Sequence, residues 1–184
     1  MKRTFPIKSL LLAATLSLVG TASALAETII FLNAKPSIIG TSVFKGHEGE
    51  IIISGFSANI ASASSVSTTP TPPGPPSQRL ASSLCGRFTI IKRVDQTSPE
   101  FIKLVLGGRH LASATITIAS NTGNGLVNFA TIQLQEVIVN SIMQNEPEPD
   151  ASSFTETIAL QAVAFTYSVD TASFGWNCAI NAPF

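Results

Sequence analysis

The two histidines, His47 and His110, are the side chains that first raise the question of a metal site or a general base. A metal site needs three or four ligands, and neither histidine has a second ligand at helix or hairpin spacing. His47 lies in a glycine-flanked turn, and His110 lies just after a predicted helix cap, two residues beyond the double glycine Gly107-Gly108. We therefore expect a turn or capping role for both histidines and no bound metal.

Three carboxylates, Glu146, Glu148 and Asp150, form the densest acidic stretch of the chain. They could bind calcium crudely, but prolines separate them and the spacing of an EF-hand loop is missing. The sequence therefore predicts a solvated acidic loop over residues 144–151.

The nucleophiles offer little for covalent catalysis. Cys85 and Cys178 have no obvious histidine base, no Gly-x-Ser-x-Gly elbow is present, and no glycine-rich phosphate loop follows a strand. Trp176, the single tryptophan, is expected to fill a core position more readily than to mark a binding surface. The sequence predicts a protein that is not an enzyme and has no cofactor, and a hydrolase is the least favoured class.

Residues 1–26 have the pattern of a secretory signal peptide. Lys2, Arg3 and Lys8 precede an apolar run from Leu10 to Val19, which is too short to span a bilayer stably. Small residues at Ala24 and Ala26 predict cleavage after Ala26. A retained membrane anchor is the alternative, and cleavage would leave residues 27–184 as a single domain in the periplasm or outside the cell.

Export also bears on the two cysteines. In an oxidising compartment a Cys85–Cys178 disulfide is the leading interpretation, although the sequence does not show that the two residues come close enough to pair. Two buried free thiols are the alternative.

The charge of the mature chain excludes several partners. Eight basic and eleven acidic residues follow Ala26, which gives a formal net charge of −3. This leaves no basic patch for nucleic acid or an acidic membrane surface, and we expect no membrane insertion after cleavage. Abundant Val, Ile, Thr and Ser with little helical periodicity predict an all-β domain.

One strand and one helix stand out. The apolar residues Phe88, Ile90, Ile91 and Val94 predict a strand whose exposed end carries Lys92 and Arg93. The helix that follows is expected to begin at Ser98 as N-cap, with Pro99 in its first turn, and to end at Gly107-Gly108. It is expected to bury a face made of Phe101, Ile102, Val105 and Leu106, with Lys103 outside.

Further strands are predicted by alternation and bounded by turns. Their expected ranges are 28–32, 50–60 with a kink at Gly55, 112–120, 127–142, 154–169 and 175–181, with a hairpin turn at 121–125. Residues 61–83 are rich in Pro and Ser and are predicted to be a long loop, because proline cannot donate a ladder hydrogen bond.

The order of these motifs resembles the Hcp family, the haemolysin-coregulated tube proteins of the bacterial type VI secretion system. Asp95, Ser98-Pro99, Gly108, Arg109 and His110 match the family's strand, helix and helix exit in order. The Lys-Gly-His and Glu-Ile elements match at His47 and Glu50, whereas Thr41 and Phe44 replace acidic positions. Later matches fall at Glu136–Ser141, Glu156, Leu160, Val163, Phe165, Tyr167, Gly175 and Trp176.

The resemblance implies a small antiparallel β-barrel, two packed sheets with one short α-helix, that assembles into hexameric rings. It implies tubes for effector transport, with the chain itself and secreted effector proteins as partners. The signal peptide departs from the family, whose members assemble in the cytoplasm. A monomeric exported binding module on the same scaffold is the alternative function.

Overall fold

The computed structural model describes residues 27–60, 86–122, 125–145 and 154–184. These residues form nine strands and one helix. The elements are β1 (Glu27–Lys35), β2 (Ile51–Ile53), β3 (Gly55–Asn59), β4 (Arg87–Arg93), α1 (Ser98–Gly107), β5 (His110–Asn121), β6 (Leu126–Asn145), β7 (Thr155–Val169), β8 (Ala172–Asn177) and β9 (Ala182–Pro183).

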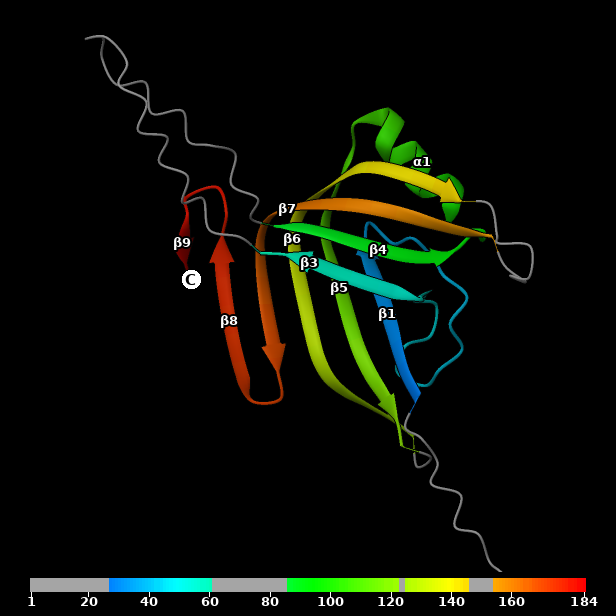
Figure 1. The fold of residues 1–184 in the computed structure, drawn as a ribbon, viewed down its shortest axis with the longest axis horizontal. Coiled ribbons are helices and arrows are strands. Elements are labelled where there is room, and N and C mark those ends of the chain that lie inside the picture. The colour runs from blue at the N-terminus through cyan, green and yellow to red at the C-terminus, as the bar shows by residue number, and fades with distance from the viewer. Residues whose placement is uncertain (1–26, 61–85, 123–124, 146–153) are drawn as a thin grey trace, which may run out of the picture.

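All strand pairs are antiparallel, and they form one sheet in the order β2-β1-β5-β6-β7-β4-β3, with β8 beside β7 and β9 beside β8. The two ends of this path, β2 and β3, are separated only by Ser54, whose N–H donates to the Ile91 carbonyl of β4. The sheet therefore closes on itself, and the predicted antiparallel barrel with one helix is confirmed (Figure 1).

Closure depends on the bending of the two longest strands. In Figure 1, β6 and β7 are both strongly curved. The first part of β6 runs beside β5 and its last part crosses the top of the barrel beside β7, whereas β7 begins beside β4 and ends beside β8. Glu136 of β6 has a left-handed φ of 47°, and the β6–β7 register shifts between Val139 and Ser141. Bulges of this kind bend a strand and allow a single sheet to form both layers of a barrel.

The core lies between the two layers. Phe88, Ile90 and Leu160 from the β4–β7 layer face residues of β1, β5 and β6, and Phe88 packs edge-on against Phe165 with ring centroids 5.7 Å apart. Every second side chain of β4 points inward, and the same holds for β7 from Thr155 to Ala164, after which Phe165 is buried as well.

Helix α1 lies against β6 and covers one end of the barrel (Figure 1). Its N-cap residue is Thr97 rather than Ser98, and Gly108 ends it with a left-handed φ of 58°, as predicted. The predicted buried face is wrong in part. Phe101 and Leu104 are buried, whereas the side chain of Leu106 is 82% exposed, because the helix packs on positions three and four residues apart through Phe101, Leu104 and Val105.

This assignment predicts a difference between two leucines of the same helix. Leu104→Ala should lower the free energy of unfolding by about 2 to 3 kcal/mol, because it leaves a cavity in the core. The matched control Leu106→Ala should lower it by less than about 0.5 kcal/mol. Urea unfolding followed by tryptophan fluorescence measures both values, and equal losses would contradict the packing of α1.

The strand predicted over 50–60 is divided into β2 and β3 at Ser54, next to the expected kink at Gly55. The predicted last strand is shorter than expected, since β8 ends at Asn177 and β9 follows after a turn. The signal peptide, the Pro/Ser-rich loop and the acidic residues Glu146, Glu148 and Asp150 lie outside the described residues. Within the described part, no helix has the length and apolar character needed to cross a membrane.

Candidate functional site

The most distinctive side chains of the barrel form a buried ionic cluster beneath the start of α1. Lys92 and Glu156 are both fully buried, and Lys92 Nζ lies 2.9 Å from Glu156 Oε1 and 2.7 Å from Asp95 Oδ1. The expectation that Lys92 occupies an exposed strand end is therefore wrong. Lys92 points inward from β4 together with Phe88 and Ile90. Its carboxylate partners offset the free energy lost when the ammonium group is removed from water.

Helix and barrel meet at this cluster through Ser98. Its hydroxyl donates to Glu156 Oε1 at 2.8 Å and accepts from the backbone N–H of Asp95 at 3.1 Å. Gln144 Nε2 donates to the second oxygen of Glu156 at 3.2 Å. The Glu156 carboxylate thus joins strands β4, β6 and β7 to the first turn of α1. In the Asp95-Ser98-Pro99 motif of the sequence, Ser98 is the residue that makes this link to the helix.

Asp95 forms the outer edge of the ionic cluster. Its Oδ1 accepts from Lys92, from the Thr97 backbone N–H at 2.8 Å and from the Thr97 hydroxyl at 2.6 Å. Burial alone would raise the pKa of Asp95, but the hydrogen bonds from Lys92 and Thr97 outweigh that effect and hold the pKa below its ordinary value. The ionised carboxylate therefore stabilises the turn that leads into α1.

The lowered pKa of Asp95 predicts a pH dependence of stability. A carboxyl group with a folded pKa below its unfolded value contributes stability above the unfolded pKa of about 3.9, and this contribution is lost as the pH falls through the folded pKa. Asp95→Asn should lower the free energy of unfolding by about 1 to 2 kcal/mol at pH 7, and the difference from wild type should shrink below about pH 4.

Urea unfolding at a series of pH values tests this expectation. Asp170→Asn is the matched control, because Asp170 is exposed in the β7–β8 turn and Asn tolerates its left-handed φ of 52°. The control should change stability by less than about 0.5 kcal/mol. A gap between wild type and Asp95→Asn that stays constant down to pH 2 would contradict the role of the carboxylate.

His47 is the centre of a second polar cluster, on the loop between β1 and β2. Its ring stacks on Phe31 with centroids 4.1 Å apart, Nδ1 lies 2.7 Å from Glu50 Oε2, and Nε2 lies 3.0 Å from Asn128 Oδ1. Asn33 donates to the other oxygen of Glu50 at 3.0 Å. His47 is therefore a buried structural residue that fastens the loop to β1 and β6, and the sequence-predicted residues His47 and Glu50 are brought together.

The loop itself is compact because its backbone groups pair internally. Gly40 N–H donates to the Gly49 carbonyl at 2.8 Å, and Gly49 N–H donates to the Ser42 carbonyl at 2.8 Å. A Cβ atom on Gly40 would overlap the carbonyl oxygen of Glu50, so only glycine fits there.

The remaining histidine is not part of either cluster. His110 begins β5 on the surface, where its Nε2 lies 3.0 Å from Glu136 Oε2, and both side chains are more than half exposed. In the described ranges, no group of three or more His, Cys, Asp or Glu side chains could hold a metal ion. No buried side-chain nitrogen or oxygen there lacks a hydrogen-bond partner.

An apolar flank, defined here as Tyr167, Val169, Phe174 and Trp176, lies on β7 and β8. Phe174 pairs with Tyr167 across the two strands and stacks on Trp176 with ring centroids 6.0 Å apart. Trp176 also packs against the core, as expected, but Phe174 is 53% and Tyr167 43% exposed. The exposure of this flank was not predicted from the sequence, although Phe174, two residues before the single Trp, was a visible signal.

Cys178 follows β8 and lies close to Gly86, the residue that follows Cys85 in the sequence. A Cβ atom on Gly86 would be 3.2 Å from Cys178 Sγ. The backbones of both residues are fixed on β7, since Cys178 N–H donates to the Val163 carbonyl and the Gly86 carbonyl accepts from Ala162 N–H, each at 2.8 Å. Cys85 lies outside the described residues, so the disulfide stays a prediction that this proximity supports.

These observations define a class of protein: a closed antiparallel β-barrel with one helix, whose buried polar clusters hold its own elements together and whose surface carries exposed apolar side chains. Residues 31–174 match the profile of the family described as "Type VI secretion system effector, Hcp". The match spans most of the chain, and the protein therefore belongs to the Hcp family.

Solved structures share this fold. Hcp1 from Salmonella typhimurium is similar with a TM-score of 0.68 and 19% identity, over 87% of this chain and 100% of that one. A structure described as a type six secretion system protein has a TM-score of 0.68 and 15% identity, over 86% and 100%. Secreted protein Hcp3 from Pseudomonas aeruginosa has a TM-score of 0.59 and 14% identity, over 83% and 98%. No curated protein matches the sequence.

Proposed function

We propose that this protein is an exported structural subunit that assembles with copies of itself into closed rings, most simply hexamers, for the transport of effector proteins. Family membership supports a type VI secretion role, and the apolar flank is the observation that supports self-association. Exposed aromatic residues grouped on one edge of a molecule are typical of surfaces that other chains cover.

The edge of the sheet next to the apolar flank also favours association. Strand β9 pairs only with Trp176 and Asn177 of β8. Among the described residues, no strand pairs with the outer edge of Ala172–Phe174. An unpaired edge can accept a strand from another chain, and cyclic closure covers every copy of such an edge in the same way.

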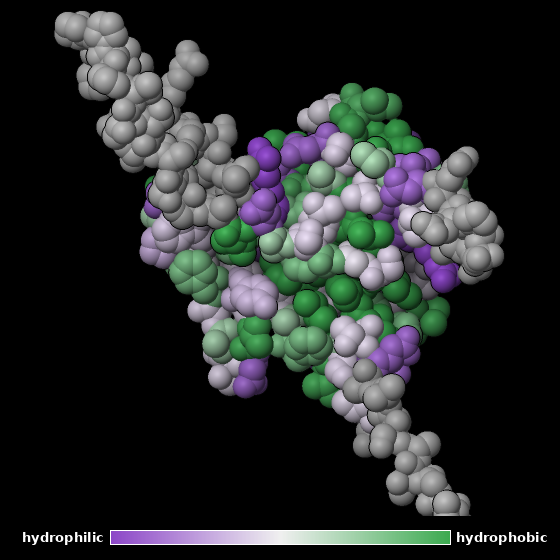
Figure 2. Space-filling view, in the orientation of Figure 1, coloured by the Kyte–Doolittle hydropathy of each residue, from purple (hydrophilic) through white to green (hydrophobic). Residues whose placement is uncertain are grey.

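The low charge of the surface fits the same function. Figure 2 shows a face whose middle is white and green, with purple hydrophilic residues at its margins. Few charges means little repulsion between copies brought side by side. Removal of residues 1–26 after Ala26 and export from the cytoplasm are part of this proposal.

Substitution within the apolar flank tests the proposed function. Phe174→Asp should raise the concentration of mature protein needed for assembly at least tenfold, because it places a carboxylate at the interface. Val43→Asp is the matched control, since Val43 is 88% exposed on the loop between β1 and β2. Light scattering coupled to size exclusion should show smaller particles for Phe174→Asp alone. A wild-type protein that stays monomeric would instead favour the exported binding module.

A further inference from the structure

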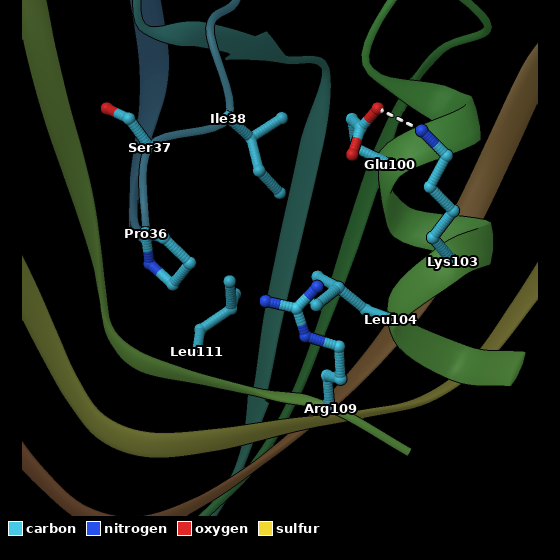
Figure 3. Close-up of a pocket in the computed structure, with 8 residues that line it drawn as sticks. All are labelled: Pro36, Ser37, Ile38, Glu100, Lys103, Leu104, Arg109 and Leu111. Atoms are coloured by element: carbon cyan, nitrogen blue, oxygen red, sulfur yellow. Dashed lines mark hydrogen bonds and ion pairs between the residues drawn. The ribbon is translucent and has the colours of Figure 1, made fainter. Parts of the chain in front are cut away.

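A pocket of about 220 Å³ opens between helix α1 and the segment that follows β1. Figure 3 shows Pro36 and Ile38 on one side, Leu104 of the helix on the other and Leu111 below, so that four of the eight lining residues are apolar. The volume is sufficient for one or two side chains of a partner rather than for a drug-sized molecule.

The pocket carries an excess of positive charge. Glu100 and Lys103 pair with each other at 2.7 Å on the helix, whereas the guanidinium group of Arg109 points into the open space (Figure 3). Within the described part of the chain, no ion pair engages Arg109. Lys35 directly precedes Pro36 and is exposed. The pocket therefore suits a ligand that combines a carboxylate with an apolar group.

The chain contains a segment of this chemistry. Residues 146–150 read Glu-Pro-Glu-Pro-Asp, with three carboxylates and two prolines in five positions. The segment connects β6 to β7, and the pairing of Asn145 with Thr155 fixes both of its ends to the barrel. Proline restricts the backbone to extended conformations, which lowers the entropy lost on binding, and its ring packs well on apolar walls.

We propose that the pocket between α1 and Pro36–Ile38 binds the acidic segment 146–150 of a second copy of this chain, with Arg109 pairing with one of its carboxylates. The proposal rests on the proposed self-assembly and names a contact within it. Because pocket and segment are different surfaces of one chain, the contact is head-to-tail, the type that closes into a ring or continues as a filament. Arginine is suited to this role because its planar fork holds a carboxylate by two hydrogen bonds.

A peptide experiment tests the pocket itself. The mature protein with Glu146→Gln, Glu148→Gln and Asp150→Asn keeps the pocket but lacks the acidic side chains that would compete with an added peptide. A fluorescein-labelled peptide of residues 144–152 should bind this protein, and Arg109→Glu should weaken binding at least tenfold, as should 0.5 M salt. Equal binding of a peptide with the three acids neutralised would overturn the proposal, as would a lack of effect of Arg109→Glu.

A mixing experiment tests whether the contact lies between chains. The Arg109→Glu protein keeps the segment and lacks the pocket charge, whereas the segment variant keeps the pocket. Each alone should form smaller particles than wild type, and a mixture should form a one-to-one complex that neither forms by itself. Docking of the segment within one chain predicts no complex in the mixture and would overturn the proposal.

The two proposals fail in different ways. If wild type and both variants all form rings of the same size, the pocket contact is wrong and ring assembly stands. If wild type is a monomer but binds the acidic peptide through Arg109, ring assembly is wrong and the pocket is a site for acidic peptides of other proteins, which overturns the second copy as occupant. Thermal melts of Arg109→Glu and of Arg109→Gln should match wild type, because Arg109 is exposed.

Discussion

Replacing Lys92 by methionine will lower the free energy of unfolding by about 3 to 5 kcal/mol. The substitution removes the ammonium group from a cluster in which Lys92 and Glu156 are both fully buried and 2.9 Å apart. Ser98 and Gln144 still donate to the Glu156 carboxylate, but no cation then balances its charge in the interior. Equilibrium unfolding in urea measures the loss.

Two variants control this experiment. Lys103→Met is the same substitution in an exposed pair with Glu100 and should cost less than about 1 kcal/mol. Adding Glu156→Gln to Lys92→Met should recover at least about 1 kcal/mol, since the remaining amide is uncharged and still bonds to Ser98. If the losses measured for Lys92→Met and for Glu156→Gln alone simply add in the double variant, Lys92 and Glu156 do not form a coupled pair.

The proposed disulfide carries the second large effect. A bridge between Cys85 and Cys178 would close a loop of roughly 90 residues, for which chain entropy gives about 4 to 5 kcal/mol, an upper value that strain reduces. Cys178→Ser should lower the free energy of unfolding by about 2 to 5 kcal/mol and release the end of β8 from Gly86.

The matched control is the other cysteine. With a bridge present, Cys85→Ser should cost as much as Cys178→Ser, and the double variant should cost no more than either single one. Thiol labelling of denatured, unreduced wild-type protein should detect no free thiol. Two labelled thiols per chain, or losses that add, would show that the cysteines are unbridged.

The strands and the single helix could be predicted from the sequence because the local signals are strong. Alternation along β5 from Ala114 to Ile116 and along β7 from Thr155 to Ala164 follows from one covered face, and the helix limits follow from Pro99 and from Gly108. These features depend only on neighbouring residues. The closure of the sheet depends on the bends in β6 and β7, for which Glu136 gives no local signal.

Lys92 shows why the buried ionic cluster could not be predicted. A lysine at a strand end is usually exposed, and its burial depends on Glu156, which is 64 residues later in the chain and reaches it only through the β4–β7 pairing. The phase of β4 was the available signal, because Lys92 continues the inward series of Phe88 and Ile90.

The helix face and the His47 loop show a second limit. The five apolar residues from Phe101 to Leu106 are compatible with more than one face of a short helix, and the position of β6 selects Leu104 over Leu106. His47 was predicted as a turn residue, but its stacking on Phe31 and its contact with Asn128 join segments that are far apart in the sequence.

The buried clusters and the apolar flank have complementary consequences for function. Lys92 with Glu156, and His47 with Glu50, stabilise a rigid barrel without offering an open reactive group. The exposed residues Tyr167 and Phe174, the edge of β8 and the pocket at Arg109 remain available to other chains. A rigid subunit with such surfaces is well suited to assembly.

Light scattering coupled to size exclusion, followed by negative-stain imaging of the protein beginning at Glu27, tests the proposed assembly most directly. We expect a single species of about six times the subunit mass and annular particles in the images. A monodisperse monomer at micromolar concentration, with no annular particles, would contradict ring assembly.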